Sequence, residues 1–290
     1  MVLLARARWV WRLPRAGIAS WQALGLAFGL ALIGLPLTLG LAPYLAADGV
    51  TVAEALLRLG PELVRGDLPA GFGPAHLVAI TAGLLIAARL LWVTGLCLLR
   101  TWQARRRHRQ LLALVGRPDP VAPGALVLDH PHAAAYCLPG LRPTIVVSAG
   151  TLALLRGEEL AAVLCHERSH ATERHDLVLL PFTALSRALA PVRWLRGADQ
   201  AVALLVEMRA DDRARQRYPE ALAAALRRFA AASGAVGAPA GALAAADRAI
   251  AIRVQRLQDH RRPPLVRGAL LFATAWALAA TPALLPVLGG

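Results

Sequence analysis

The stretch LCHERSH, residues 164–170, holds residue types at a spacing that could do chemistry. His166 and His170 are four positions apart, so on a helix both rings project from one face. That spacing suits two imidazole nitrogens on one Zn²⁺ ion. Glu167 lies beside the first histidine, where it can take a proton from a metal-bound water that attacks a carbonyl. The segment predicts a catalytic zinc centre; the alternative is two surface histidines on a polar helix.

A third ligand is available on a second predicted helix, ADQAVALLVEMRADDRARQR. Glu207 lies 37 residues after His170 among apolar neighbours, where an unpaired carboxylate would be costly to bury. Two histidines, one glutamate and an open water position form a known catalytic zinc set. Asp211, one turn later, could accept the free ring N–H of a ligand histidine and orient it. We therefore predict one zinc per chain on His166, His170 and Glu207, although Glu207 could instead pair with a nearby arginine.

The remaining polar residues near the motif carry weaker predictions. His175 and Asp176 follow the second zinc histidine closely, and they either support the site from behind or form a polar helix end. We include Asp176 among the supporting residues of the site. The three cysteines, at unrelated spacings, cannot form a disulfide framework or a cysteine-rich zinc site: Cys97, Cys137 and Cys165.

The composition limits the class of protein and the kinds of catalytic site that the chain can have. The chain has 290 residues, of which 57% are hydrophobic, and its mean hydropathy is +0.51. This excess argues against disorder and against a purely soluble enzyme. The 32 basic residues are all arginine and outnumber 18 acidic residues, which gives a formal charge of +14. The absence of lysine excludes P-loop, Schiff-base and S-x-x-K acyl-enzyme chemistry.

Three apolar runs are long enough to cross a membrane as helices. They cover about 17–42, 75–99 and 267–290, so the chain divides into a membrane region (1–100), a central domain (101–266) and a last span. The second run is interrupted by Arg89. We favour an arginine that extends towards the nearer interface, and the alternative is a buried charge that contacts the catalytic domain.

Loop charges predict the orientation of these spans. The N-terminus and the segment RTWQARRRHRQ after the second span are strongly basic, whereas the loop between the spans is mostly acidic. The positive-inside rule then places the N-terminus and 101–266 in the cytoplasm, in a multi-pass protein of the cell membrane. The basic run adjoins a membrane helix, so the anionic lipid leaflet is a simpler partner than nucleic acid.

The central domain is predicted to be α+β. The β-prone runs ALVLDH, AAYCL and TIVVS come first, with a hairpin turn predicted at Pro139-Gly140, and helices follow from Thr151. The strand RPTIVVS either pairs only within the sheet or serves as an edge that aligns an extended peptide. For residues 177–195 we favour a buried or interfacial helix pair over a membrane span.

The combined motifs resemble the BlaR/MecR-type membrane zinc metallopeptidases, which are gluzincins. The resemblance covers roughly 125–260. It includes a "P-x-I-V" strand at 143–146, the H-E-x-x-H helix at 155–170, an "E-x-x-x-D" helix at 207–211 and RVQRLQ at 253–258.

This resemblance implies a zincin-like fold for the central domain, with zinc on His166, His170 and Glu207, Glu167 as general base, and Asp211 as an orienting residue. It also implies a cytoplasmic catalytic domain that cleaves a protein substrate, a transcriptional repressor, during signalling. The sensors of that group carry a penicillin-binding domain after their last span. This chain stops at Gly290 and has no lysine for acylation, so we expect no direct β-lactam sensing.

Two other functions remain open. A CAAX-protease or heat-shock type of membrane metalloprotease shares H-E-x-x-H and a downstream glutamate, and it would process lipidated or misfolded membrane proteins. A non-catalytic membrane signalling protein with a structural zinc is the other alternative. Glu167 argues against the latter, because a structural site needs no base.

Overall fold

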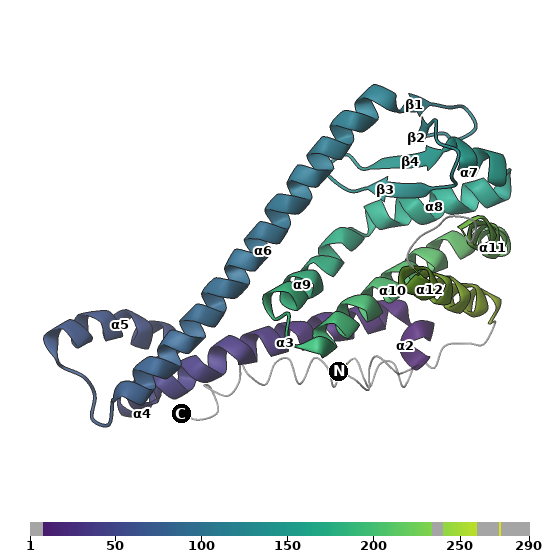
Figure 1. The fold of residues 1–290 in the computed structure, drawn as a ribbon. Coiled ribbons are helices and arrows are strands. Elements are labelled where there is room, and N and C mark those ends of the chain that lie inside the picture. Colours follow the sequence, from purple (N-terminus) through teal and green to yellow (C-terminus); the bar gives the residue numbers. More distant parts are fainter. Residues whose placement is uncertain (1–7, 234–239, 260–272, 274–290) are drawn as a thin grey trace.

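The computed structural model describes residues 8–233, 240–259 and 273. Its helices are α2 (Arg8–Arg12), α3 (Pro14–Gly40), α4 (Ala42–Asp48), α5 (Val52–Arg65), α6 (Pro74–Val115), α7 (Ala149–Leu154), α8 (Glu158–Thr172), α9 (His175–Ala188), α10 (Arg193–Arg215), α11 (Ala221–Ser233) and α12 (Ala240–Gln258). Its strands are β1 (Arg117–Pro118), β2 (Ala125–Leu128), β3 (Ala135–Leu138) and β4 (Thr144–Ser148). Figure 1 shows the small sheet at one end of the long helix α6, with α3 packed near the other end.

Helix α3 covers the first predicted span as far as Gly40 and α6 contains the second, and both helices are long and apolar enough to cross a membrane. They cross closely where Gly40 and Gly83 leave no room for a Cβ atom against Ile80 and Leu37. Only 17% and 11% of their most apolar windows are buried, so these helices are unlike the core helices of a soluble domain. The third predicted run, 267–290, lies outside the described residues apart from Ala273.

Helix α6 does not stop at the end of the apolar run. It continues through the basic segment to Val115, because no proline or glycine interrupts the sequence after Gly95 until Gly116. The predicted boundary between the membrane region and the central domain, at residue 100, therefore lies inside one continuous helix.

The sheet has the strand order β1-β2-β4-β3. The predicted hairpin is confirmed, because β3 and β4 pair antiparallel with Cys137 opposite Ile145. The edge role considered for RPTIVVS is wrong, because β2 pairs with β4 in parallel on its other side, with Val127 opposite Val147. The edge strands are β1 and β3, and β3 contacts α8.

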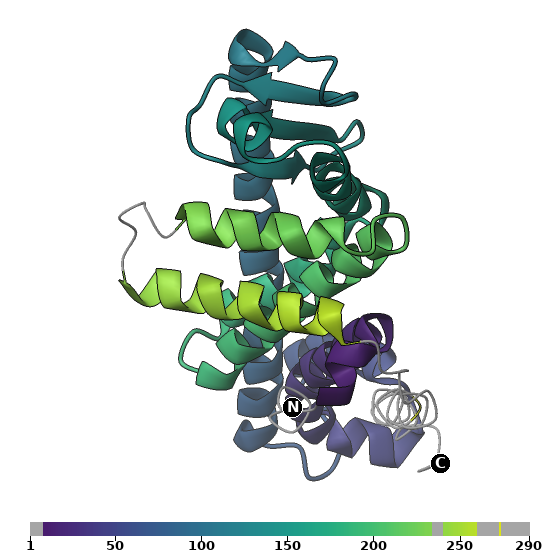
Figure 2. The same ribbon diagram turned by 90° about the vertical axis from the view of Figure 1, so that its right-hand side faces the viewer.

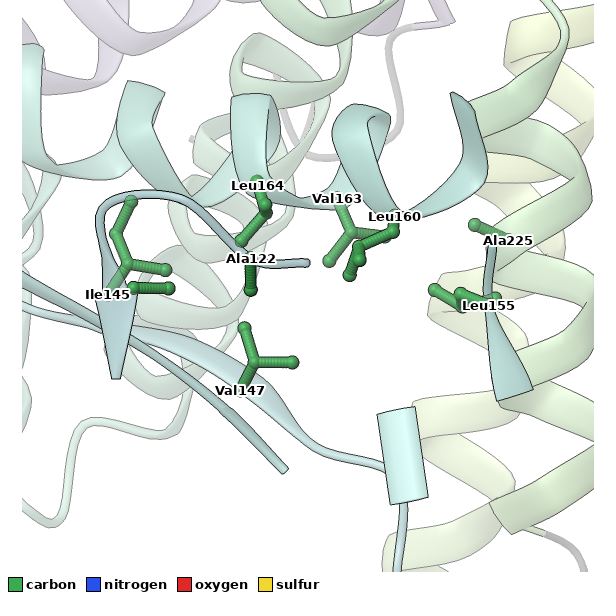
Figure 3. Packing of buried hydrophobic residues seen from close by; sticks show 9 residues of the cluster. Ala122, Ile145, Val147, Leu155, Leu160, Val163, Leu164 and Ala225 are labelled. Carbon is green, nitrogen blue, oxygen red and sulfur yellow. The ribbon is translucent and has the colours of Figure 1, made fainter. Parts of the chain in front are cut away.

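The apolar side of α8 packs on this sheet and fixes the direction of its polar side. Leu160, Val163 and Leu164 of α8 form a buried cluster with Ile145 and Val147 of β4 (Figure 3). Burial of each large aliphatic side chain contributes about 1.5–3 kcal/mol. The cluster thus holds the predicted H-E-x-x-H helix, which is confirmed as a helix, with one face on the sheet.

Helices α9 and α10 form a hairpin that lies alongside the candidate spans. The rings of Trp21 and Phe182 meet edge to face with centroids 6.3 Å apart, and those of Phe28 and Trp194 at 5.0 Å. This is the helix pair that we favoured for residues 177–195. Figure 2 shows α11 and α12 lying side by side across the molecule, between the sheet and α2.

Arg89 anchors the end of this hairpin to α6. Its Nε donates a hydrogen bond to the carbonyl oxygen of Ala188, at 2.8 Å. A cation at a helix C-terminus also interacts favourably with the helix dipole. Arg89 is exposed in the structure rather than a buried charge, so its extension towards the interface stays a prediction.

Candidate metal and catalytic site

Three donor groups converge between α8 and α10. The Nε2 atoms of His166 and His170 are 3.1 Å apart. The Glu207 carboxylate oxygens lie 3.4 Å from His166 Nε2 and 3.5 Å from His170 Nε2. The structure thus brings together the three residues predicted to bind zinc, and they form a group that could hold a metal ion.

The spacing of these atoms fits a zinc ion. Tetrahedral Zn–N bonds of about 2.0–2.1 Å place two ligand nitrogens about 3.3 Å apart. The observed separations of 3.1–3.5 Å agree with this value, and no backbone movement is required. The donor set of two imidazoles and one carboxylate is also a catalytic zinc set, with a fourth position left for water.

The position of Glu207 follows from the packing of α10, which is confirmed as a helix. Its neighbours Val206 and Met208 are fully buried, in a cluster with Leu205 and Val202. This packing anchors the helix, so the carboxylate of Glu207 faces α8. The cost of placing the Glu207 carboxylate within an apolar sequence is offset by its contacts with charged groups of the site.

Asp211 lies behind the first histidine, as the one-turn spacing predicted. Its Oδ1 is 3.1 Å from His166 Nδ1, and its side chain has no exposed surface. Burial opposes ionisation of Asp211, but contacts with Arg253 and His166 outweigh it and lower its pKa to about 2. The ionised carboxylate can therefore hold the His166 ring with Nε2 turned towards the other donors.

Arg253 of α12 completes this side of the site, and the sequence reasoning missed it. It donates to Asp211 through Nε at 2.8 Å and Nη2 at 2.7 Å, and its Nη1 lies 2.9 Å from Glu207. Arg253 therefore links two carboxylates of the site. The segment RVQRLQ was noted only as part of a resemblance, and it gave no sign that its first residue is buried.

His170 has a different partner behind it. The Nδ1 atoms of His170 and His175 are 3.0 Å apart, and His175 is 3% exposed. His175 Nε2 in turn lies 3.5 Å from Glu173. Of the two functions left open for His175, support of the site from behind therefore has a direct contact in its favour.

Within the described residues, no hydrogen bond or ion pair joins Asp176 to the three donor groups. Its Oδ2 accepts a hydrogen bond from Arg105 of α6 at 3.0 Å. Asp176 also lines the cleft that contains the donor group, so its supporting role stays a prediction beside its observed contact between α6 and α9. Its position one residue after His175 on a helix turns it away from His170.

Glu167 lies beside the donor group in a cleft of about 550 Å³. Burial raises its pKa to about 7, although His166, Arg253 and a backbone group of Cys137 act in the opposite direction. A carboxylate with a pKa near neutrality is suited to accept and return a proton. The cleft is bordered by β3, including Ala135, Tyr136 and Cys137.

Two of the donor groups already favour the form that binds a metal. Burial lowers the pKa of His170 to about 4, so its ring is neutral at pH 7. Burial opposes ionisation of Glu207, but His166, Arg253 and His170 lower its pKa to about 2. A neutral imidazole and an ionised carboxylate are the protonation states that a metal requires.

Comparison with known proteins agrees with this geometry. No curated protein and no solved structure matches the chain. Residues 99–235 match the model described as Peptidase family M48, and this match supports a metallopeptidase without singling out the BlaR/MecR type. M48 peptidases are typically zinc-dependent. The matched segment contains the H-E-x-x-H helix and Glu207, so the similarity to family M48 includes the residues of the candidate site.

Proposed function

We propose that the protein is a membrane-anchored zinc endopeptidase that hydrolyses peptide bonds of a cytoplasmic or membrane-proximal protein. The observation that carries the proposal is the convergence of His166, His170 and Glu207 beside the partly buried Glu167. The match to family M48 supports the same chemistry.

His166, His170 and Glu207 would hold the zinc ion. When bound, zinc would polarise the scissile carbonyl and lower the pKa of the nucleophilic water towards about 7. The Glu167 carboxylate would accept a proton from that water and deliver it to the leaving amine. Asp211 and His175 would keep the two rings in orientation through their contacts at Nδ1.

Strand β3 is a suitable guide for an extended substrate. It is an edge of the sheet, it contacts α8, and its residues border the cleft beside Glu167. A peptide added to this edge would form backbone hydrogen bonds that are independent of its sequence. We therefore assign to β3 the role that the sequence alone suggested for β4.

Membrane anchoring is supported by the exposed apolar surfaces of α3 and α6. Leu35 and Leu39 of α3 are 63% and 59% exposed, and Leu91 and Trp92 of α6 are 75% and 69% exposed. In water such surfaces would favour aggregation, whereas lipid chains would cover them. We propose the topology from the charge pattern: a multi-pass protein of the cell membrane, with 1–100 and 267–290 as membrane regions and 101–266 in the cytoplasm.

The proposed substrate class rests on resemblance alone. Signalling peptidases of the BlaR/MecR type would cleave a repressor, whereas the CAAX-protease or heat-shock type would cleave lipidated or unfolded membrane proteins. Incubating the purified protein with a repressor encoded beside its gene and with an unfolded membrane protein separates these possibilities. Cleavage of only the unfolded protein would contradict the signalling role.

Metal removal tests the catalytic proposal itself. The full chain is purified in detergent, its zinc content is measured, and peptide hydrolysis is followed before and after chelation. We expect about one zinc per chain, loss of hydrolysis on chelation, and recovery when one equivalent of zinc is returned. Hydrolysis that continues in fully metal-free protein would contradict the proposal.

A further inference from the structure

A second cavity lies between α6, α9 and the turn that joins β3 to β4. Its volume is about 850 Å³. It borders the catalytic cleft, because Pro139, Asp176 and Leu179 line both. The proposed peptidase mechanism does not use this cavity.

The cavity is strongly basic. Among the described residues that line it are five arginines and one acidic residue: Arg105, Arg109, Arg142, Arg174, Arg187 and Asp176. Asp176 is already engaged by Arg105 at 3.0 Å, and Arg174 lies 3.8 Å from it. The lining therefore has a formal surplus of four positive charges, which favours an anionic ligand.

The turn holds one of these arginines in place. Arg109 Nη2 donates to the carbonyl oxygen of Pro139 at 2.6 Å. Its guanidinium lies so close to Gly140 that a Cβ atom at this position would collide with it. Arg142, just beyond the turn, is exposed, and it makes no hydrogen bond or ion pair within the described ranges.

The remaining wall of the cavity is mostly apolar and open to the surroundings. Leu98 and Trp102 of α6 are 48% and 55% exposed, and Leu177 of α9 is 50% exposed. They lie where α6 changes from apolar to basic, since Leu99 ends the second apolar run and Arg100 begins the basic segment. In the proposed topology this level is the boundary between the inner leaflet and the cytoplasm.

We propose that this cavity binds an anionic phospholipid, with its phosphate at Arg109 and Arg142 and an acyl chain along Leu98 and Leu177. The inference rests on the membrane location in the proposed function. Basic pockets on the cytoplasmic side of membrane helices suit lipid headgroups. An acidic peptide or a nucleic acid would satisfy the charges, but neither would cover the exposed leucine and tryptophan wall at the level of the bilayer.

The test is a binding titration on the full chain in detergent by native mass spectrometry, with short-chain phosphatidylglycerol, phosphatidylcholine and inorganic phosphate as separate ligands. Each arginine near an anionic surface contributes a factor of about five in affinity. We therefore expect Arg109→Gln with Arg142→Gln to weaken phosphatidylglycerol binding about 25-fold. The control, Arg156→Gln with Arg227→Gln, makes the same charge change at exposed positions outside the cavity and should retain wild-type affinity.

The single variant Arg142→Glu tests binding without removing a structural contact, because the exposed Arg142 side chain has no hydrogen-bond or ion-pair partner within the described ranges. It should weaken binding at least as much as the loss of one arginine. Equal affinity for both lipids, equal loss in the control pair, or saturation by inorganic phosphate at the same concentration would overturn the proposal. Displacement of phosphatidylglycerol by an acidic peptide at lower concentration would also overturn it. None of these measurements depends on peptide hydrolysis, so their outcome is separate from that of the catalytic proposal.

Discussion

Arg253 and Asp211 form a buried two-bond salt bridge that joins α12 to α10 behind the donor group, with N–O distances of 2.7 and 2.8 Å. Asp211 is 0% exposed and Arg253 is 9% exposed. Because the same guanidinium also reaches Glu207, one cation positions both the proposed ligand carboxylate and the carboxylate behind His166.

Replacement of Arg253 by methionine should therefore destabilise the fold. Removing one partner of a buried ion pair leaves an uncompensated charge and costs about 3–5 kcal/mol. The free energy of unfolding, measured by denaturant titration in detergent, should fall by that amount. Arg248→Met, at an exposed position of the same helix, is the control and should change it by less than about 0.5 kcal/mol.

The double variant Arg253→Met with Asp211→Leu tests the reason for this loss. Replacing both members of a buried pair by apolar groups is often neutral or stabilising. The double variant should recover more than half of the stability lost in Arg253→Met. If it is as unstable as the single variant, the unpaired Asp211 charge is not the cause.

Glu167→Gln should separate metal binding from catalysis. The amide cannot accept the water proton, so we expect peptide hydrolysis to fall by about 10²–10⁴-fold, a typical contribution of general base catalysis. Zinc content should remain about one per chain, because Glu167 is not among the three converging donors. Glu158→Gln, an exposed change on the same helix, should leave both quantities unaltered. Loss of zinc in Glu167→Gln would assign it to the metal instead.

His175→Ala should weaken zinc binding without removing a ligand. The ring lies 3.0 Å from His170 Nδ1, and loss of such an outer partner typically costs 10–100-fold in metal affinity. Competition with a chromogenic chelator measures this affinity directly. His132→Ala, at an exposed position, is the matched control. Unchanged affinity in His175→Ala would show that the contact does not orient His170.

Glu173 should make stability depend on acid pH. Partial burial opposes its ionisation, but hydrogen bonds from Arg209 and Arg213 outweigh this effect and lower its pKa to about 2. Since the folded pKa lies below the unfolded value near 4.5, its stabilising contribution is present above about pH 4.5 and is lost as pH falls towards 2.

Melting temperatures of wild type and Glu173→Gln at several pH values measure that contribution. We expect wild type to be more stable at pH 7, with a difference that shrinks between pH 4.5 and 2.5. A difference that is the same at both ends of this range would contradict the assignment. Glu158→Gln supplies the baseline for an exposed glutamate.

The sequence alone predicted the site residues that are spaced by one helical turn. The four-residue spacing of His166 and His170, and of Glu207 and Asp211, needs only a helix to be meaningful. Arg253 could not be found in this way, because an arginine between Ile252 and Val254 in a helical segment fits an exposed helix face as well as a buried one. Its burial results from α12 crossing α10, a contact between segments 42 residues apart.

Local sequence patterns also could not predict the order of the strands in the sheet. An alternating or apolar run such as TIVVS is compatible with an edge strand and with an internal strand. Which one forms depends on the parallel pairing of β2 with β4, two strands that are separated in the sequence by β3. Similarly, hydropathy located the end of the apolar run at Leu99, but it carries no information on where the helix itself ends.

Because α6 is one continuous helix, a tilt of its apolar half would also move its basic half and the sheet at its end. Its 42 residues span about 63 Å at 1.5 Å per residue, and its two ends lie near α4 and near the sheet. With the apolar half set in a bilayer, a change of about 5° in tilt would displace the far end by roughly 5 Å. Because helix tilt adjusts to bilayer thickness, the distance between the sheet and the membrane surface would vary with the lipids around α3 and α6.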